Sequence, residues 1–473
     1  MHSVDKFYIQ GQWVQPARGA THADIIDPAT EAVAGRLAMG TAADVDRAVA
    51  AAREAFPAWS VSTRETRIAL LERIIAAYQA RMADLAQAVR QEIGAPITLA
   101  TSLQAAIGLG QLQATLQALR DFAFESPRGK SLVLREAIGV AALITPWNWP
   151  LNQIAAKVAP ALAAGCTVVL KPSEIAPLDA QIFAEIMDAA GTPPGVFNML
   201  YGEGRVVGAA LSSHPEVDMV SITGSTRAGV EVAISAAPTV KRVAQELGGK
   251  SPLIVLDDAD LQAAVTSGVA QCMVNSGQTC VAPTRVLVPR ARYEEAVQIA
   301  AAVANAVKVG DPSDPETRMG PISNRGQYDK VQRLIGVGIE EGARLAAGGP
   351  GRPDGLAHGF YARPTIFADV RNDMTIAREE IFGPVLCLLP YDSEEEAVAI
   401  ANDTDFGLAA YIASADPARA RKLAARLRAG NVRINGAMMD ITAPFGGYKT
   451  SGNGREYGPE GIAEFLETKT VTG

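Results

Sequence analysis

The chain has 473 residues, which is too long for a single hydrophobic core, so two or three domains are expected. Hydrophobic residues make up 48% and charged residues 20%, which is typical of an ordinary soluble globular protein. The formal net charge of −8 argues against a nucleic acid as partner, because an acidic surface repels a polyanion. The N-terminus has no signal-peptide pattern and no apolar run could span a bilayer, so we expect a cytoplasmic protein without a membrane partner.

The first hundred residues are predicted to be mostly helical after a short hairpin-like piece. The stretch TAADVDRAVAAAREAFPAW predicts a helix that stops at Pro57. The next large apolar residues recur every three or four positions from 68 to 93, the pattern of one helix that faces a core. Ser62 or Thr63 would cap the start of this helix, and Gly94 with Pro96 would end it.

From residue 138 onwards, short β-branched runs alternate with helical stretches. This alternation predicts an α/β fold in which βαβ units surround a parallel sheet. A second series begins at residues 251–256, so we expect a domain boundary near Gly248 and Gly249. Residues 126–139 and the C-terminal stretch are strand-like but have no place in either series. They could pair with each other or with the edge of another subunit.

The four cysteines are Cys166, Cys272, Cys280 and Cys387. No C-x-x-C pair exists, which argues against a zinc site or a redox pair, and a reducing compartment argues against disulfides. Cys280 lies among small and polar residues in NSGQTCVAPTR, whereas buried free cysteines usually lie in apolar runs. For Cys280, packing and nucleophilic chemistry therefore remain as the two alternatives.

Two segments could bind a nucleotide. A strict G-x-G-x-x-G is absent, and Gly202, Gly204 and Gly208 form only G-x-G-x-x-x-G, for which a tight turn is the simpler interpretation. In SITGSTRAGVEVA, a strand leads to Gly224 and Ser225 at what we expect to be a helix N-terminus. Free N–H groups and the helix dipole attract phosphate there, although a plain turn remains an alternative.

A lysine and a glutamate follow an apolar strand in VVLKPSE. In parallel α/β sheets, ligands bind just beyond the carboxyl ends of strands, which is where Lys171 and Glu174 are predicted to lie. A carboxylate at that position can accept hydrogen bonds from ribose hydroxyls and would repel a 2′-phosphate. A solvated loop is the alternative interpretation.

Candidate groups for acid–base chemistry and oxyanion binding are a glutamate and an asparagine. The chain has only four histidines, and none forms an evident pair with a cysteine. Glu246 ends a strand-like run in VAQELGGKSP, where an apolar flank would raise the pKa of a carboxyl group towards that of a base. Asn148 in ITPWNWP is held between tryptophans and prolines and could donate to an oxyanion. A surface glutamate and aromatic core packing are the respective alternatives.

Several motifs together suggest a family. In chain order, PWNWP, KPSE, ITGSTRAG, ELGGKSP, GQTC, EEIFGPV and PFGGYKTSGNGRE resemble those of the aldehyde dehydrogenase superfamily, in particular its NAD(P)-dependent, hydrolytic members, over nearly the whole chain. The resemblance implies that Cys280 is the nucleophile, Glu246 the general base and Asn148 an oxyanion donor. Lys157 and Glu456 match positions with a supporting proton-relay role.

The resemblance also implies a cofactor site. Lys171 and Glu174 would contact the adenosine ribose, Gly224 and Ser225 the pyrophosphate, and Glu380 with Phe382 the nicotinamide ribose. NAD is favoured over NADP, because Glu174 would repel the 2′-phosphate. The implied cofactor-binding residues are Ile144, Trp147, Lys171, Ser173, Glu174, Gly204, Gly208, Gly224, Ser225, Leu247, Gln327, Lys330, Glu380 and Phe382.

The architecture that the resemblance implies has three parts. Residues 1–125 and 140–248 would form a Rossmann-like NAD-binding domain, residues 249–440 an α/β catalytic domain, and residues 126–139 and 441–473 oligomerisation or bridging segments that include a small β element. A homodimer or homotetramer that acts on a small-molecule aldehyde is expected. The chain departs from some members at Val281, where they carry a second cysteine next to the nucleophile.

Two other functions compete with aldehyde oxidation by hydrolysis. A CoA-acylating semialdehyde dehydrogenase passes the acyl group to CoA, but such relatives generally lack the glutamate that stands here as Glu246. A non-catalytic binding protein on the same fold would have lost its catalytic residues, whereas Cys280, Glu246 and Asn148 are all present.

Overall fold

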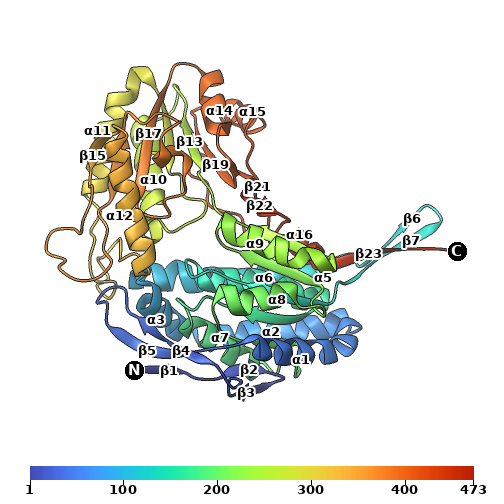
Figure 1. Cartoon of the computed structure of the whole chain (residues 1–473). Helices are drawn as coiled ribbons and strands as arrows, with labels where there is room; N and C mark the ends of the chain where they lie inside the picture. The colour runs from blue at the N-terminus through green and yellow to red at the C-terminus, as the bar shows by residue number, and fades with distance from the viewer.

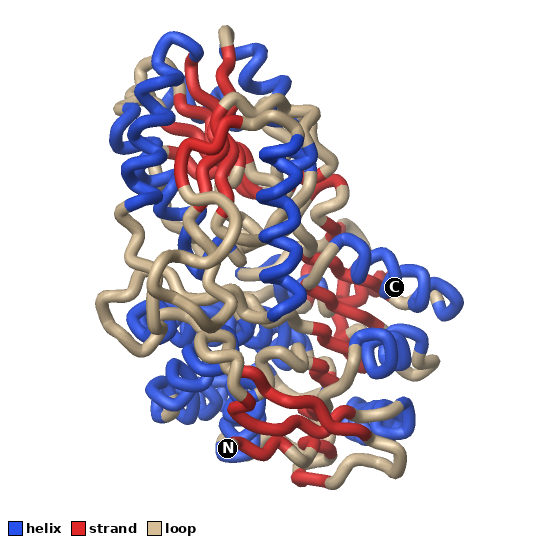
Figure 2. The backbone as a smooth tube through the Cα atoms, turned by 60° about the vertical axis from the view of Figure 1, so that its left-hand side comes forward, coloured by secondary structure: helices blue, strands red, loops and turns tan.

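The computed structural model describes all residues, from Met1 to Gly473. Two bodies, each built on its own large sheet, lie one above the other, and a narrow arm of strands projects from the lower body (Figure 1). Figure 2 shows the strands of the two bodies as separate groups, with helices around them and long loops between them. The predicted α/β fold class is confirmed. No helix has both the length and the apolar character needed to cross a membrane.

The lower body contains an eight-stranded sheet in the order β22-β12-β11-β8-β9-β10-β2-β3. Its five central strands are parallel, and β8 and β9 are buried along their whole length, as expected for a sheet covered on both faces. The strands are β2 (Phe7–Ile9), β3 (Gln12–Val14), β8 (Val140–Ile144), β9 (Thr167–Lys171), β10 (Phe197–Met199), β11 (Met219–Thr223), β12 (Arg242–Glu246) and β22 (Gly452–Asn453). The helices that follow the central strands are α6 (Pro150–Ala164), α7 (Leu178–Ala189), α8 (Ala209–Ser213) and α9 (Thr226–Ala236).

The N-terminal helices correct two predictions. The first helix does not end at Pro57 but continues to Ser60, because a proline this close to the helix end removes little of its hydrogen bonding. The helix predicted over the next apolar stripe is broken at Arg81, whose φ and ψ are −109° and 9°. The stripe could not reveal this break, since its spacing continues unchanged across it. The helices are α1 (Ala42–Ser60), α2 (Arg64–Ala80), α3 (Met82–Ile93) and α5 (Ala105–Asp121).

Local signals at the ends of these helices are confirmed. The Thr63 hydroxyl accepts a hydrogen bond from the Thr66 N–H, so Thr63 rather than Ser62 caps α2. Gly94 follows α3 in a left-handed conformation, which ends that helix. A small sheet in the order β1-β5-β4 precedes α1; its strands are β1 (His2–Val4), β4 (Thr21–Ile26) and β5 (Val33–Met39).

The upper body contains a seven-stranded sheet in the order β15-β16-β17-β14-β13-β19-β20. All its strands except β15 run parallel, and a separate apolar core lies on each face. The strands are β13 (Pro252–Val255), β14 (Arg285–Pro289), β15 (Arg344–Ala347), β16 (Thr365–Ala368), β17 (Val385–Tyr391), β19 (Ala409–Ala413) and β20 (Asn431–Ile434). The helices are α10 (Leu261–Met273), α11 (Tyr293–Asn305), α12 (Arg325–Glu340), α14 (Glu394–Asn402) and α15 (Pro417–Ala424).

The arm is a three-stranded antiparallel sheet of β6 (Glu125–Arg128), β7 (Ser131–Ala137) and β23 (Leu466–Thr472). The two segments without a place in the βαβ series therefore pair with each other, which was one of the two alternatives. Residues 441–473 do not form one unit, however. β22 extends the lower sheet and α16 (Gly458–Glu464) packs against α5 and α6, so only β23 joins the arm. The remaining short elements are α4 (Ile97–Leu99), α13 (Thr375–Arg378), β18 (Phe406–Gly407) and β21 (Tyr448–Lys449).

Candidate active site

A cleft of about 240 Å³ lies between the two bodies. Trp147, Gly224 and Leu247 reach it from loops that follow strands of the lower sheet, at their carboxyl ends. Cys280 and Glu380 reach it from loops that precede β14 and β17, at the amino ends of the upper sheet. The general rule that ligands bind at carboxyl ends of parallel strands therefore applies to the lower body only.

Ten of the sequence-predicted site residues line this cleft: Trp147, Asn148, Gly224, Ser225, Leu247, Cys280, Gln327, Lys330, Glu380 and Phe382. Three further lining residues were not predicted: Pro146, Thr223 and Gly248. Each of the three is a direct neighbour of a predicted residue. The motifs therefore identify the loops that line the cleft, but not every lining residue within each loop. The other nine predicted residues lie outside this lining: Ile144, Lys157, Lys171, Ser173, Glu174, Gly204, Gly208, Glu246 and Glu456.

Cys280 differs from the other three cysteines because it is only partly buried. The loop before it is unusual, since Asn275, Ser276 and Gly277 all have left-handed backbone, with φ of 53°, 56° and 74°. A side chain at Gly277 would overlap the backbone of Gly383, so only glycine fits at that position. This tight turn places the thiol at the wall of the cleft.

Buried amide groups fix Asn148 against the same loop. Its side-chain nitrogen donates to the Gln278 carbonyl at 3.0 Å. The backbone carbonyl of Asn148 accepts hydrogen bonds from Asn275 Nδ2 at 2.7 Å and from Gln104 Nε2 at 3.1 Å. These contacts join residues that are 44 to 130 positions apart, so no local sequence signal could reveal Gln104 or Asn275 as supports of the site.

The surroundings of Cys280 favour the protonated form of its thiol. Burial, Glu380 and Glu246 raise the pKa of the thiol to about 12. At neutral pH the thiol of the protein alone is therefore protonated, and it becomes a strong nucleophile only when a base removes the proton.

Glu246 is the carboxyl group suited to accept a proton here. It is only 4% exposed, and neither of its side-chain oxygens has a hydrogen-bond partner. Burial first, and then the neighbouring Glu456, raise its pKa well above the usual value, against a smaller opposite effect of Lys157. A side chain at Gly446 would come within 2.8 Å of Glu246 Oε1, so the backbone of the PFGGY motif packs directly on this carboxyl group.

Lys157 and Glu456 form a buried ion pair next to Glu246. The Lys157 Nζ donates to Glu456 Oε1 and, at 3.0 Å, to the hydroxyl of Ser221. The second Glu456 oxygen has no partner. The structure thus brings the two predicted relay residues together, and it adds Ser221, which the sequence did not single out.

A second group of predicted residues gathers where β9 ends. Lys171 is buried, and its Nζ donates to the Pro172 carbonyl at 2.9 Å and lies 3.4 Å from Glu174 Oε2. Burial lowers the pKa of Lys171. The Glu174 side chain is 38% exposed, so its carboxylate stays accessible to a ligand. Gly208 is close by, since a side chain there would touch both Ile144 and Lys171 at 3.9 Å.

The glycine-containing segments have different structures. Residues Gly204–Gly208 form a π-helical turn that continues into α8, so the tight-turn interpretation of this run is wrong. The second segment is as predicted: β11 leads to Ser225, which caps α9 by accepting a hydrogen bond from the Ala228 N–H at 3.3 Å. The first N–H groups of α9 thus point towards the cleft, where they could bind an anion.

Glu380 and Phe382 close the other end of the cleft. Glu380 Oε1 accepts from the Gly249 N–H at 2.9 Å, and burial raises the pKa of this carboxyl group. The Gln327 side chain donates to the Phe382 carbonyl at 2.9 Å, and the Phe382 ring meets Trp147 edge-on, with centroids 5.5 Å apart. Ser173, by contrast, caps its own loop by accepting from the Ile175 N–H at 3.2 Å.

A partly exposed thiol and a side-chain amide line one cleft between two α/β bodies, and a buried carboxyl group lies close by. Such a set of groups suits an enzyme that binds its substrate covalently through a cysteine. The profile of the aldehyde dehydrogenase family matches residues 13–471. A 3-succinoylsemialdehyde-pyridine dehydrogenase from Pseudomonas sp is 55% identical, covering 100% of this chain and 99% of the relative. The chain belongs to the aldehyde dehydrogenase family, and it is an oxidoreductase that acts on an aldehyde.

Solved structures are similar over nearly the whole chain. The C291A mutant of aldehyde dehydrogenase C from Pseudomonas syringae, in complex with NAD+ and octanal, has a TM-score of 0.98 and 53% identity, covering 99% of this chain and 96% of that one. A Mycobacterium tuberculosis aldehyde dehydrogenase in complex with NAD+ has a TM-score of 0.97 and 42% identity, covering 99% and 98%. The family resemblance noted in the motifs is therefore confirmed.

Proposed function

We propose that this protein oxidises an aldehyde to a carboxylic acid, with NAD as cofactor and Cys280 as nucleophile. The observation that carries the proposal is the placement of a partly exposed thiol at the cleft, next to the anchored Asn148 amide and close to a carboxyl group without a partner. The NAD+ and octanal bound by the Pseudomonas syringae relative support it.

The residues present fit NAD. Lys171 and Glu174 would hold the adenosine ribose, the N-terminus of α9 at Ser225 the pyrophosphate, and Glu380 the nicotinamide ribose. Glu174 carries an accessible negative charge that would repel a 2′-phosphate, which favours NAD over NADP. When bound, NAD supplies the acceptor for a hydride from the substrate carbon.

In the acylation half-reaction, Glu246 in its carboxylate form takes the proton of the Cys280 thiol. The thiolate then attacks the carbonyl carbon and forms a C–S bond. The Asn148 side-chain N–H and the Cys280 backbone N–H donate to the oxyanion that develops. Loss of a hydride from the same carbon leaves a thioester on Cys280.

Before the second half-reaction, Glu246 gives up the proton that it took from Cys280. It then takes a proton from a water molecule that attacks the thioester. The C–S bond breaks, the acid leaves and Cys280 is regenerated. Because both Glu246 oxygens lack partners, the side chain breaks no hydrogen bond when it turns towards the thioester. Glu456 and Lys157 lie next to Glu246 and can pass its proton onwards. Burial and Glu456 raise the pKa of Glu246, so its carboxylate accepts a proton more readily than an exposed glutamate does.

The assembly that we propose is a homodimer or homotetramer joined through the arm. Beyond Leu466 every residue of β23 is exposed, and Leu132 and Val471, which face each other in the register, are among the exposed large apolar residues. A bare three-stranded sheet needs a surface to cover it. Leu132→Glu with Val471→Glu should therefore shift the mass measured by light scattering to that of a monomer, and an unchanged mass would contradict this assembly.

The location that we propose is cytoplasmic. All four cysteines are free, and a partly exposed thiol stays available as a nucleophile only where the surroundings are reducing. Fractionation of the producing cells tests this location, and recovery of the protein outside the cytoplasmic fraction would contradict it.

The function is tested by Glu246→Gln, because glutamine cannot accept a proton from water. With NAD and an aldehyde, this variant should lose steady-state turnover and most of the first burst of NADH, because Cys280 loses the base that takes its proton. The small fraction that still reacts should remain as a thioester, visible as an acyl mass adduct on the peptide that contains Cys280. Wild-type protein in the same assay should produce NADH continuously without the adduct. Near-wild-type hydrolysis by the variant would reject Glu246 as the base and favour the CoA-dependent alternative.

A further inference from the structure

Three buried polar side chains from different elements form a hydrogen-bonded chain. Gln111 Nε2 of α5 donates to Asn152 Oδ1 of α6 at 3.0 Å. Asn152 Nδ2 in turn donates to the hydroxyl of Tyr457, just before α16, at 3.3 Å. All three are 5% exposed or less. Polar side chains in such a position are costly unless they are bonded, so this chain of contacts requires a specific arrangement.

Tyr457 is held in an unusual conformation. Its φ of 69° and ψ of 157° belong to a region that side chains rarely adopt and that glycine normally occupies. Its ring stacks on Phe445, with centroids 5.1 Å apart and planes at 24°. Backbone strain of this kind persists where the surroundings determine a side-chain position, and it is concentrated at functional sites.

Tyr457 belongs to a cluster beside the nucleophile, and it does not line the cofactor cleft. Tyr457, Phe445, Leu408 and Ala156 form a small apolar cluster, against which Cys280 packs. Cys280 also lines the cleft, so it stands between the two. If NAD occupies the cleft, the aldehyde has to reach Cys280 from the side of the cluster.

The two hydrogen bonds of Asn152 leave the hydroxyl hydrogen of Tyr457 free to be donated. Asn152 Oδ1 is already used by Gln111, so the Asn152 amide presents its N–H to the Tyr457 oxygen. No group of the chain accepts the hydroxyl hydrogen of Tyr457. A tyrosine hydroxyl in this state has a hydrogen free to donate to a substrate group that binds in the cluster beside Cys280.

We propose that Tyr457 is a specificity-determining residue, whose hydroxyl donates a hydrogen bond to an oxygen or nitrogen acceptor on the substrate. The protein then prefers aldehydes that carry such an acceptor, for example a second carbonyl group or a ring nitrogen, over plain alkyl or aryl aldehydes. A site that binds a polar group discriminates against a substrate without it, because the buried donor is left unpaired. This inference rests on the proposed function, since it requires the substrate to react at Cys280.

The test compares matched substrates in wild-type protein and in Tyr457→Phe, which removes the hydroxyl but keeps the ring on Phe445. kcat/KM is measured by NADH absorbance for 4-oxopentanal against pentanal, and for pyridine-3-carbaldehyde against benzaldehyde. The ratio within each pair cancels effects on folding and on cofactor binding. We expect Tyr457→Phe to lower both ratios roughly five- to tenfold, the loss of about one hydrogen bond, while the plain aldehydes change less than about twofold.

Two further variants make the result specific. Asn152→Asp offers a carboxylate that takes the Tyr457 hydrogen away from the substrate, so it should lower the same ratios although the tyrosine is intact. Tyr391→Phe removes a hydroxyl that donates to the Val255 carbonyl at 2.7 Å, on the far side of the upper body, and should leave both ratios unchanged.

Unchanged ratios in an active Tyr457→Phe protein, or equal losses for all four substrates, would overturn this inference alone. Wild-type protein that oxidises none of the four aldehydes with NAD would overturn the proposed function and this inference with it.

Discussion

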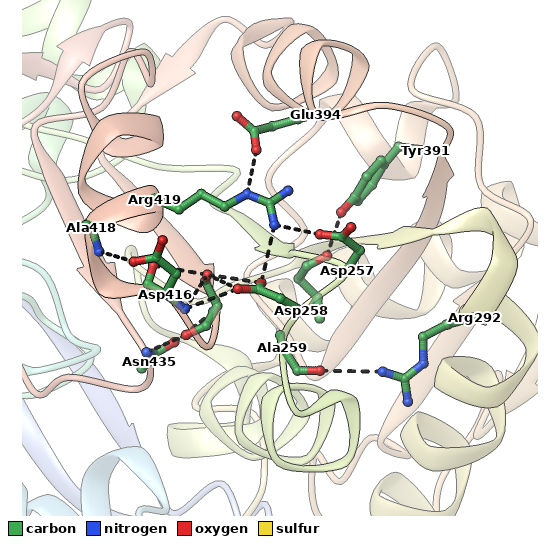
Figure 3. Close-up of polar contacts among 12 residues, drawn as sticks. Asp257, Asp258, Ala259, Arg292, Tyr391, Glu394, Asp416, Ala418, Arg419 and Asn435 are labelled. Carbon is green, nitrogen blue, oxygen red and sulfur yellow. Dashed lines mark hydrogen bonds and ion pairs between the residues drawn. The ribbon is translucent and has the colours of Figure 1, made fainter.

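The two ends of the upper sheet have opposite characters. At the amino ends of its strands, next to the cleft, polar groups lack partners: the Lys250 ammonium group just before β13 is buried and makes no hydrogen bond. At the carboxyl ends the charges are paired. There, Arg419 binds Asp257 at 2.7 Å and Glu394 at 3.0 Å, and it lies 3.6 Å from Asp258 (Figure 3).

Hydrogen bonds join further residues at the carboxyl end of the upper sheet, which we call the closed end. The Ser414 hydroxyl, after β19, donates to Asp258 after β13, and the Tyr391 hydroxyl of β17 donates to the Val255 carbonyl. In parallel sheets ligands usually bind at carboxyl ends, but here the charged groups named at that end are paired with one another. Buried polar groups without partners, rather than the direction of the strands, therefore distinguish the end of this sheet that faces the cleft, which we call the reactive end.

The strongest test of the reactive end is Cys280→Ser. A serine hydroxyl has a much higher pKa than a thiol, and the base next to it is a carboxylate rather than a histidine. We expect aldehyde oxidation, measured as NADH formation, to fall below a few per cent of the wild-type rate. NAD binding, measured by calorimetry, should stay nearly intact. A variant that keeps more activity than this would reject Cys280 as the nucleophile.

A smaller loss is expected at Asn148, which is 3% exposed and anchored to the Cys280 loop. Asn148→Ala removes one oxyanion donor, so the first turnover should slow by roughly a hundred- to a thousandfold, or about 3 to 4 kcal/mol. Rapid mixing with NADH absorbance measures this step. If the single-turnover rate does not change, the amide has no part in acylation.

A moderate change is expected at Glu174, which lies where β9 ends and outside the lining of the cleft. Glu174→Gln removes the negative charge that would face a 2′-phosphate. The ratio of kcat/KM with NAD to that with NADP should therefore fall roughly tenfold, as expected for one partly screened charge. The wild-type ratio is the control. A wild-type preference for NADP would mean that the carboxylate points elsewhere.

The smallest effect on activity is expected at the closed end. Arg419→Met removes the ion pairs shown in Figure 3, and because the Arg419 side chain is 35% exposed, the free energy of unfolding should fall by only about 1 kcal/mol. kcat and KM should equal those of the wild type. Denaturant unfolding and steady-state kinetics measure the two quantities, and a large loss of kcat would contradict the division between a reactive and a closed end.

The sequence predicted those features that depend on neighbours in the chain. The α/β alternation, the Thr63 cap and the strand-to-helix passage at Ser225 each leave a local pattern, and all three are present. The family motifs are also local patterns, and they indicated the loops that line the cleft. The roles of the individual residues stay predictions until the variants above are measured.

What the sequence did not predict depends on contacts between distant segments or on small shifts of backbone geometry. The break at Arg81 leaves the apolar spacing intact, and the π-helical turn at Gly204 uses glycines that fit a tight turn equally well. Gln104 and Asn275 support Asn148 only because the fold brings the segment before α5, the loop before α6 and the Cys280 loop together. No single stretch of sequence contains that information.

The left-handed loop before Cys280 also limits how the protein can vary. Gly277 has no room for a side chain, so any exchange there would displace the nucleophile. Asn275 already is the residue that best tolerates left-handed backbone after glycine, whereas Ser276 is not, and its hydroxyl is tied to the Gly320 carbonyl at 2.8 Å. Over generations of random mutation, position 277 would thus be closed to change, while position 276 would be open chiefly towards glycine and asparagine.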